Sequence, residues 1–232
     1  MYPHLFTYCE QRKMWTENPL PFLTPANICL VGSQQSGKTF LTMKLLENIK
    51  YSFSPAPKKV LYCYTEWQDK FDAMQDSIPN ITFHQGLPSC SYIEEWSTER
   101  DGSLIILDDL MTSICSSLDM VQLFTVKCHH RNITTLMLNQ SLFPTGKYAR
   151  TLSLNCNYII LFKNYRDSNQ VKCLGSQLFP SKGQYFMDAY EKATHKLYGY
   201  LCIDIHPRSD KKYQLRTNIL KGEYPVVFVP RA

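Results

Sequence analysis

Apolar runs of four to six residues alternate with segments of helical periodicity from residue 27 onward. The runs are bounded by polar or turn-forming residues, which is typical of strands, and they cover residues 27–31, 60–65, 81–84, 104–107, 133–138 and 158–162. The segments with helical periodicity cover residues 40–49, 66–74, 92–99, 118–130 and 168–178. Continuous apolar strands separated by helices are typical of a parallel sheet with both faces covered. The pattern therefore predicts an α/β fold with a mostly parallel central sheet flanked by helices on both faces.

The two ends of the chain differ from this alternating core. Residues 1–25 contain four prolines and predict an N-terminal arm that leads into the core. Residues 198–204 and 213–219 have strand character and predict an antiparallel edge, whose role the residues leave open. We therefore expect an arm, a core that covers residues 26–180, and a C-terminal extension (181–232) whose edge strands pack on the core.

The pattern G-x-x-x-x-G-K-[ST] lies between the first predicted strand and the first predicted helix, and it is the phosphate-binding P-loop. Glycine permits the backbone angles of a loop whose amides point inward. Those N–H groups and the positive end of the following helix bind the β-phosphate of a nucleotide. Lys38 adds a mobile charge for the β- and γ-phosphates, and the hydroxyl of Thr39 is a ligand for Mg²⁺. The predicted ATP-binding residues are Gly32, Ser33, Gln34, Gln35, Ser36, Gly37, Lys38, Thr39 and Phe40.

Two adjacent carboxylates follow the buried strand at residues 104–107, which gives the segment the form of a Walker B motif. Asp108 is predicted to hold the Mg²⁺ shell, through water or Thr39, because Mg²⁺ needs hard oxygen ligands. Asp109 is predicted to be the general base that polarises the attacking water. Glu66 also follows a predicted strand and is an alternative base. Acidic pairs also end ordinary strands, so the P-loop upstream is what favours the catalytic interpretation.

Polar and basic residues gather at the end of the next predicted strand. Gln140 follows this strand, where its amide can contact the γ-phosphate and report hydrolysis. Arg131 and Arg150 are the candidates for an arginine that a neighbouring subunit inserts to neutralise the charge of phosphoryl transfer. The other basic residues of this cluster are Lys147, Lys163 and Arg166. Such side chains also bind DNA phosphates without reading sequence, or form an ordinary solvated rim, and the residues leave these alternatives open.

Composition narrows the class of protein only modestly. The 232 residues have a hydrophobic share of 44%, which suits one large α/β domain. The net charge of +5 permits a polyanionic partner without establishing one. Apolar runs are far shorter than the roughly 18 residues of a membrane span, and the N-terminus lacks the hydrophobic region of a signal peptide. We therefore expect a soluble, intracellular protein with no membrane partner.

The cysteines predict neither a disulfide framework nor a metal site. There are nine of them, an odd number, without a C-x-x-C pair. Cys29, Cys63 and Cys202 lie in apolar strand-like runs, where cysteine acts as a small hydrophobic residue. The run Cys-His-His at 128–130 looks like a ligand cluster, but no second half at zinc spacing exists. We interpret it as the end of a helix.

Several blocks of the chain resemble the HerA–FtsK class of P-loop ATPases, and more narrowly the poxvirus-type genome-packaging ATPases of large DNA viruses, adintoviruses and Polinton (Maverick) elements. The blocks that carry the resemblance are residues 32–39, 104–109, 129–143, 146–155 and 158–167. The similarity runs from about residue 25 to residue 180, and residues 215–219 fit the family's tail. The blocks between 129 and 167 are much more specific than the P-loop.

This resemblance implies a homo-oligomeric ring, with subunits that share ATP sites, which pumps double-stranded DNA into a preformed capsid. Capsid or portal-vertex proteins are then further partners. The residues that match the family's Walker A pair, Walker B pair and sensor glutamine are Lys38, Thr39, Asp108, Asp109 and Gln140. Cellular members of the class usually carry glutamate at the position of Asp109, which is one methylene longer. They often carry arginine at the position of Ser141.

The sequence therefore predicts a Mg²⁺-dependent ATPase that translocates double-stranded DNA and packages a viral or Polinton-type genome. The places expected for it are the host nucleus, a cytoplasmic virus factory or the virion. A nucleotide or small-molecule kinase is the alternative, but the chain shows no signature of the lid that kinases often carry. The intact Lys38, Asp108 and Asp109 argue against a scaffold that binds nucleotide without hydrolysing it.

Overall fold

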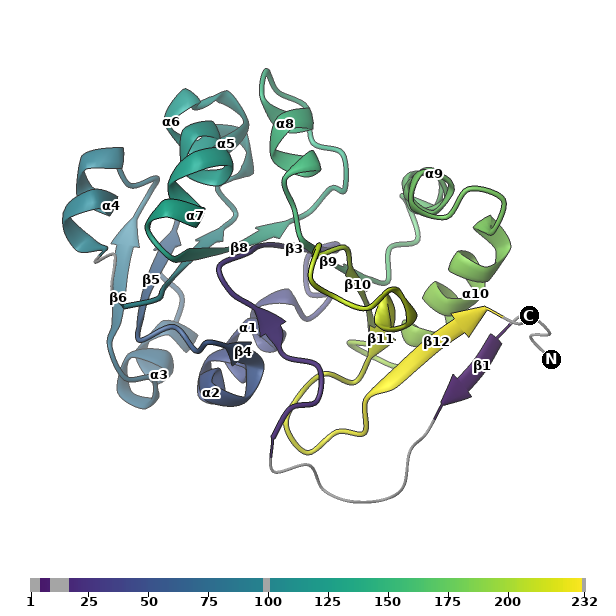
Figure 1. Cartoon of the computed structure of the whole chain (residues 1–232). Coiled ribbons are helices and arrows are strands. Elements are labelled where there is room, and N and C mark those ends of the chain that lie inside the picture. Colours follow the sequence, from purple (N-terminus) through teal and green to yellow (C-terminus); the bar gives the residue numbers. More distant parts are fainter. Residues whose placement is uncertain (1–4, 9–16, 98–100, 231–232) are drawn as a thin grey trace.

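A large sheet forms the centre of the computed structural model, which describes residues 5–8, 17–97 and 101–230 (Figure 1). In chain order its strands are β1 (Leu5–Tyr8), β3 (Asn27–Val31), β5 (Lys59–Tyr64), β6 (Ile81–Gln85), β7 (Ser103–Asp108), β8 (Ile133–Asn139), β9 (Tyr158–Phe162), β10 (Tyr200–Asp204), β11 (Leu215–Thr217) and β12 (Val226–Pro230). In space the order is β1-β12-β11-β10-β9-β3-β8-β7-β5-β6. The strands from β9 to β6 are parallel, and β10, β11, β12 and β1 continue the sheet as antiparallel strands. A separate small sheet pairs β2 (Phe22–Leu23) with β4 (Phe53–Ser54).

Helices connect the strands and cover both faces of the sheet (Figure 1). They are α1 (Lys38–Glu47), α2 (Ile49–Ser52), α3 (Lys70–Ser77), α4 (Cys90–Trp96), α5 (Met111–Ser116), α6 (Leu118–Gln122), α7 (Cys128–His130), α8 (Ala149–Leu154), α9 (Ser168–Leu178) and α10 (Gly183–Ala193). A π-helical segment, Leu123–Lys127, joins α6 to α7, and a 3-10 turn, Lys211–Tyr213, precedes β11. In the part of the chain that is described, no helix is long and apolar enough to cross a membrane.

The alternation of side chains along each parallel strand explains why both faces need helices. In β3, Ile28 and Leu30 point into the cluster on the side of α1 and α3, whereas Cys29 and Val31 point into the cluster on the side of α4–α10. All five residues of β3 are buried. Because successive side chains of a strand lie on opposite faces, a continuous apolar strand is stable only between two layers of helices. The predicted α/β fold with a mostly parallel sheet is confirmed.

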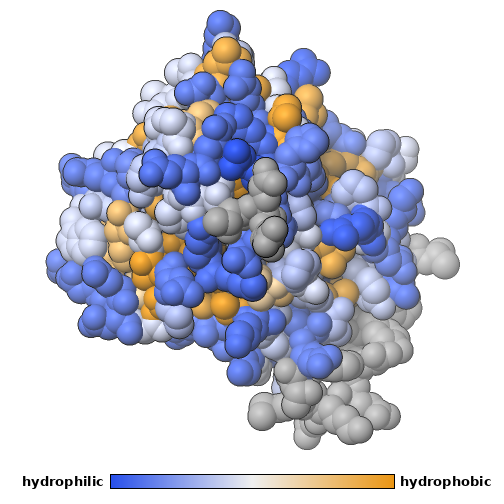
Figure 2. Space-filling model, turned by 60° about the vertical axis from the view of Figure 1, so that its left-hand side comes forward, coloured by the Kyte–Doolittle hydropathy of each residue, from blue (hydrophilic) through white to orange (hydrophobic). Residues whose placement is uncertain are grey.

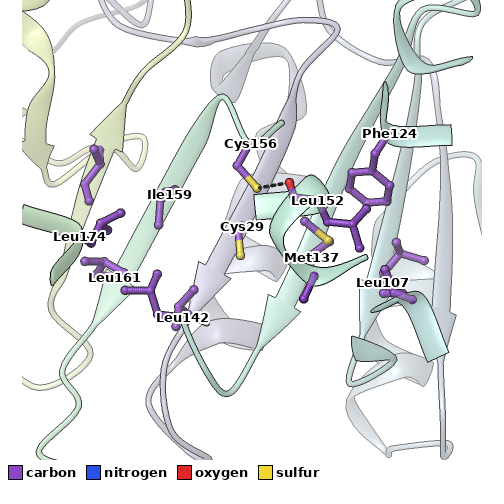
Figure 3. Packing of buried hydrophobic residues seen from close by; sticks show 14 of the residues in the cluster. Cys29, Leu107, Phe124, Met137, Leu142, Leu152, Cys156, Ile159, Leu161 and Leu174 are labelled. Carbon is purple, nitrogen blue, oxygen red and sulfur yellow. Dashed lines mark hydrogen bonds between the residues drawn. The ribbon is translucent and has the colours of Figure 1, made fainter. Parts of the chain in front are cut away.

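The larger cluster packs helices from the middle of the chain onto the sheet. Figure 3 shows Cys29, Met137 and Ile159, from three neighbouring strands, beside Leu152 of α8 and Phe124 of the π-helical segment. Hydrophilic residues dominate the face of the molecule seen in Figure 2, where hydrophobic residues form small separate groups. The apolar residues of the core strands are therefore buried in the interior of the protein.

Most of the predicted core elements are present, with one shifted helix. The helix expected over 66–74 begins only at Lys70, because Trp67 lies in the preceding turn and packs its ring against Phe71 and Phe83. The run 128–130 is α7, the end of a helix as expected. The last residues of the helix expected over 92–99 lie outside the described residues.

The terminal segments contribute strands to the same sheet. The expected antiparallel character of residues 198–204 and 213–219 is confirmed by β10 and β11. β12 and α10, which the sequence pattern did not reveal, complete this part. Within the expected arm, β1 pairs with β12, whereas residues 1–4 and 9–16 lie outside the described residues. The division into arm, core and extension remains a prediction.

Candidate functional site

The carboxyl ends of β3, β7 and β8 meet at a pocket of about 640 Å³. It is lined by residues 34–40 and by Gln68, Lys70, Asp108, Asp109, Gln140 and Tyr198. Strand order explains this meeting, because β8 pairs with β3 on one side and with β7 on the other. Ligands of open α/β sheets bind at this edge. The structure thus brings the predicted P-loop, acidic pair and glutamine to one place.

The P-loop joins β3 to α1 through a tight turn. Gly37 has φ of 106°, a backbone conformation that favours glycine, and it immediately precedes α1. The amide of Gly32 donates to the carbonyl oxygen of Asn139 at 3.1 Å, which ties the loop to the end of β8. A Cβ atom at Gly32 would lie 2.7 Å from the Cβ atom of Phe162, so only glycine fits there. Gly32 and Ser33 hold the loop without being among the pocket-lining residues.

The ammonium group of Lys38 is held over the loop. Its Nζ atom donates to the carbonyl oxygens of Gly32 at 2.7 Å and Ser33 at 2.9 Å. Burial lowers the pKa of Lys38, and the nearby carboxylates of Asp109 and Asp108 oppose that shift. The first turn of α1 contains no acidic residue, so its N-terminal amides keep their attraction for anions.

The two adjacent carboxylates occupy different environments. Asp108 ends β7 and is buried, and its Oδ2 atom accepts a hydrogen bond of 2.6 Å from the hydroxyl of Tyr62. Burial raises the pKa of Asp108, and the hydrogen bond from Tyr62 opposes part of this shift. Asp109 is exposed and has φ of 58°, so the chain turns sharply after the strand. One carboxylate is thus fixed inside the sheet edge and the other faces the pocket.

Gln140 is positioned by the next strand and contacts the exposed carboxylate. It follows β8 directly, and its Nε2 atom donates to Oδ1 of Asp109 at 2.9 Å. A carboxylate and an amide held together at the mouth of the predicted phosphate-binding loop can bind and orient one water molecule between them.

The predicted arginines and Glu66 do not line the pocket. Arg131 precedes β8, which places it at the opposite edge of the sheet from the P-loop. Its Nη1 atom donates to the carbonyl oxygen of Glu94 at 3.1 Å. Arg150 is exposed in α8.

Four further residues belong to the site, although sequence reasoning did not select them. Gln68 and Lys70 reach the pocket from the turn and the helix after β5, and Tyr198 reaches it from the turn before β10. Tyr62 supports Asp108 from the neighbouring strand β5. Lys70 lies within electrostatic range of both Asp108 and Lys38. Only Tyr62 had a local signal, since a hydroxyl inside an apolar strand needs a buried partner.

Comparison of the whole structure with solved structures gives the same architecture. The chain is similar to the genome-packaging NTPase B204 from Sulfolobus turreted icosahedral virus 2 in complex with sulfate, with a TM-score of 0.54 and 12% identity over 79% of this chain and 93% of that chain. It is also similar to B204 in complex with ATP-γS, with a TM-score of 0.52 and 12% identity over 78% and 92% of the two chains. No family model matches the chain, and no curated protein matches it. At this identity the likeness shows the fold alone, which is a mostly parallel sheet with helices on both faces.

Proposed function

We propose that this chain is a Mg²⁺-dependent ATPase whose turnover drives the translocation of double-stranded DNA. The observation that carries the proposal is the single pocket that combines the P-loop with Asp108, Asp109 and Gln140. A kinase needs room and groups for an acceptor, whereas a carboxylate hydrogen-bonded to an amide suits the activation of water. Hydrolysis is therefore the reaction that these side chains support best.

The oxygen atoms at the pocket fit a magnesium ion. Thr39 supplies a hydroxyl and Asp108 a carboxylate, and both residues line the same pocket. These are the hard ligands that Mg²⁺ requires. When bound, the ion would neutralise the charge of the β- and γ-phosphate oxygens. The hydrogen bond from Tyr62 fixes the orientation of Asp108, and the ammonium of Lys38 pairs with the phosphate oxygens.

In this proposal Asp109 and Gln140 act on the attacking water. Asp109 is exposed to the pocket and accepts the proton of the water as it attacks the γ-phosphate. Gln140 holds the carboxylate through its Nε2 atom and keeps its amide oxygen for the water. Lys70 adds a second positive charge from the same subunit on the side of Asp108.

An exposed loop after β9 supports the proposed contact with DNA. Tyr165 is 85% exposed, and the Nζ atom of Lys163 lies 4.8 Å from the centre of its ring. Asn164 braces the loop, since its amide donates to the hydroxyl of Tyr190 and its Oδ1 atom accepts from the amide of Arg166. The loop therefore presents two cations and an aromatic ring on a fixed backbone. Cations in this arrangement bind the phosphates of a polyanion without reading its sequence.

The proposed motor is a homo-oligomeric ring that packages a viral or Polinton-type genome into a capsid. The similarity to a structure described as a DNA-packaging ATPase, and the family resemblance of residues 129–167, support this assignment. Within such a ring, Arg150 is the better candidate for an arginine acting on a neighbour's site. It is exposed, whereas Arg131 is half-buried and engaged with Glu94. Capsid or portal-vertex proteins are the further partners proposed.

The proposal is tested by ATP hydrolysis at increasing protein concentration, with and without duplex DNA. We expect activity per subunit to rise with concentration and to rise further with DNA, and the DNA effect to fall steeply with salt. Turnover that ignores DNA and requires a nucleoside acceptor would instead assign the chain to the kinases. A rate of hydrolysis per subunit that is the same at all protein concentrations would argue against an ATP site shared between subunits.

A matched pair of variants links this effect to the loop. The double variant Lys163→Ala/Arg166→Ala is expected to lose most of the stimulation by DNA. The control Lys50→Ala/Lys221→Ala removes the same charge from exposed residues beside a different pocket and should retain it. Equal loss in both would mean that only the net charge matters.

A further inference from the structure

Two exposed aromatic side chains lie beside the P-loop. Tyr198 reaches it from the side of β9 and β10, whereas the acidic pair comes from β7, on the other side of β3. Phe40 of α1 is 49% exposed and Tyr198 is 50% exposed, and both line the pocket at the carboxyl ends of β3, β7 and β8. Their ring centres are 6.1 Å apart, and the ring planes are tilted by 30°. Large rings that keep half of their surface in water beside a ligand pocket are available to a ligand with a flat apolar face.

The position of Tyr198 is fixed by its own turn. The backbone of Tyr198 has φ of 59°, and the amide of the next residue, Gly199, donates to the carbonyl oxygen of Lys196 at 2.9 Å. A Cβ atom at Gly199 would lie 2.5 Å from the carbonyl oxygen of Ala193, so the turn requires glycine. Tyr200 then enters β10 and pairs with Phe162 of β9. The ring is thus presented from the central sheet.

Tyr198 also contacts the P-loop itself. A Cβ atom added at Gly37 would lie 3.0 Å from Cδ1 and 3.1 Å from Cβ of Tyr198, so the side chain lies directly over this glycine. Gly37 precedes Lys38 and the first amides of α1, where the phosphates are proposed to bind. A nucleotide held there by its β-phosphate can place its base either toward the acidic pair or toward Tyr198. The acidic side is polar and charged, whereas the side of Tyr198 is aromatic.

We propose that Tyr198, together with Phe40, forms the platform on which the base of the bound nucleoside triphosphate stacks. This inference rests on the proposed nucleotide binding and adds a residue from the C-terminal segment to the site. Stacking of a base on an aromatic side chain contributes enough affinity that its loss weakens binding by about tenfold or more. The antiparallel extension thereby has a part in the site, because it carries Tyr198 to the P-loop.

Binding measurements on the full chain separate stacking from phosphate recognition. Titration calorimetry with Mg²⁺ and ATP is compared with inorganic tripolyphosphate, which has the phosphates but no base. We expect Tyr198→Ala to weaken ATP binding by about tenfold or more and to leave tripolyphosphate binding unchanged. Tyr198→Phe keeps the ring and should bind ATP as the unchanged chain does. Tyr198→Ala removes the ring and keeps the Cβ atom that lies near Gly37, and tripolyphosphate binding reports whether the loop packing is retained.

Tyr224→Ala is the matched control, since this tyrosine is 42% exposed and does not line the pocket. Its binding of both ligands should equal that of the unchanged chain. Full ATP affinity in Tyr198→Ala would overturn the inference, as would an equal loss of ATP and tripolyphosphate, which would indicate a role in loop packing alone. If the unchanged chain binds neither ligand, the proposed function itself fails.

Discussion

The carboxyl edge of β3, β7 and β8 and the antiparallel strands β10–β12 use charged side chains in opposite ways. At the edge, Asp109 is exposed and Lys38 is only partly buried, and both line an open pocket. In the antiparallel strands, Asp204 and Arg216 form an ion pair of 2.7 Å, and each side chain is only 2% exposed.

The surroundings of the ion pair explain the difference. The amide of His206 and the hydroxyl of Ser209 also donate to Asp204, so its carboxylate is occupied. Arg216 lies over the ring of Tyr158, and its Nε and Nη2 atoms have no hydrogen-bond partner among the described residues. Burying a charge carries a large desolvation penalty. Removing one partner of a buried ion pair therefore destabilises the protein by more than the intact pair stabilises it. The charged pair inside the antiparallel strands is therefore enclosed by the fold, whereas Lys38 and Asp109 at the edge line an open pocket.

The largest expected effect is on stability and concerns the buried ion pair. Asp204→Asn leaves Arg216 buried without a counter-charge, and we expect the free energy of unfolding to fall by about 3–5 kcal/mol. Urea unfolding of the full chain measures this. The control Glu47→Gln removes the partner of Lys44 from a pair whose side chains are 36% and 32% exposed, and should cost less than about 1 kcal/mol. Similar losses in both variants would refute the distinction.

The next effect concerns the ammonium group over the P-loop. Lys38→Ala removes the positive charge that is proposed to pair with the phosphates, and we expect hydrolysis to fall by about 10²–10³-fold. Steady-state ATPase measurements test this, with the free energy of unfolding as control, since a half-buried lysine contributes little to the fold. Near-normal turnover would rule out the P-loop assignment.

A smaller effect separates nucleotide binding from hydrolysis. Asp109→Asn keeps the shape of the side chain and the hydrogen bond from Gln140 but removes the proposed base, so we expect ATP affinity to be retained and turnover to fall about 100-fold. Nucleotide titration and single-turnover hydrolysis measure the two quantities separately. Unchanged turnover would move the role of base to another carboxylate, with Glu66 as the first to test.

The smallest effect concerns the hydrogen bond that orients Asp108, the proposed Mg²⁺ ligand. Tyr62→Phe deletes the hydrogen bond to Asp108, and we expect the Mg²⁺ concentration for half-maximal hydrolysis to rise about tenfold. A Mg²⁺ titration of the ATPase reaction measures this shift. Tyr64→Phe, in the same strand, is the control and should leave the Mg²⁺ requirement unchanged. An identical Mg²⁺ requirement in Tyr62→Phe would mean that Asp108 needs no support.

Local patterns predicted the parallel half of the fold better than the antiparallel half. β3 and α9 have the predicted boundaries, because an apolar run between turns and a helical period of apolar residues are both strong local signals. α10 was missed, although it has a clear apolar face that includes the buried Tyr185, Phe186 and Tyr190. β11 has only three residues, one of which is the buried Arg216, and its burial depends on Asp204 from another strand.

The amino-acid sequence by itself determined the P-loop and the positions of Asp108, Asp109 and Gln140 at the ends of apolar strands. These features are local, since each depends on a few consecutive residues and their hydrophobic pattern. Only the tertiary structure decided that β8 lies between β3 and β7, and that Lys70 and Tyr198 reach the same pocket. Strand order and the approach of distant turns depend on how helices pack on both faces of the sheet, and no short stretch of residues contains that information.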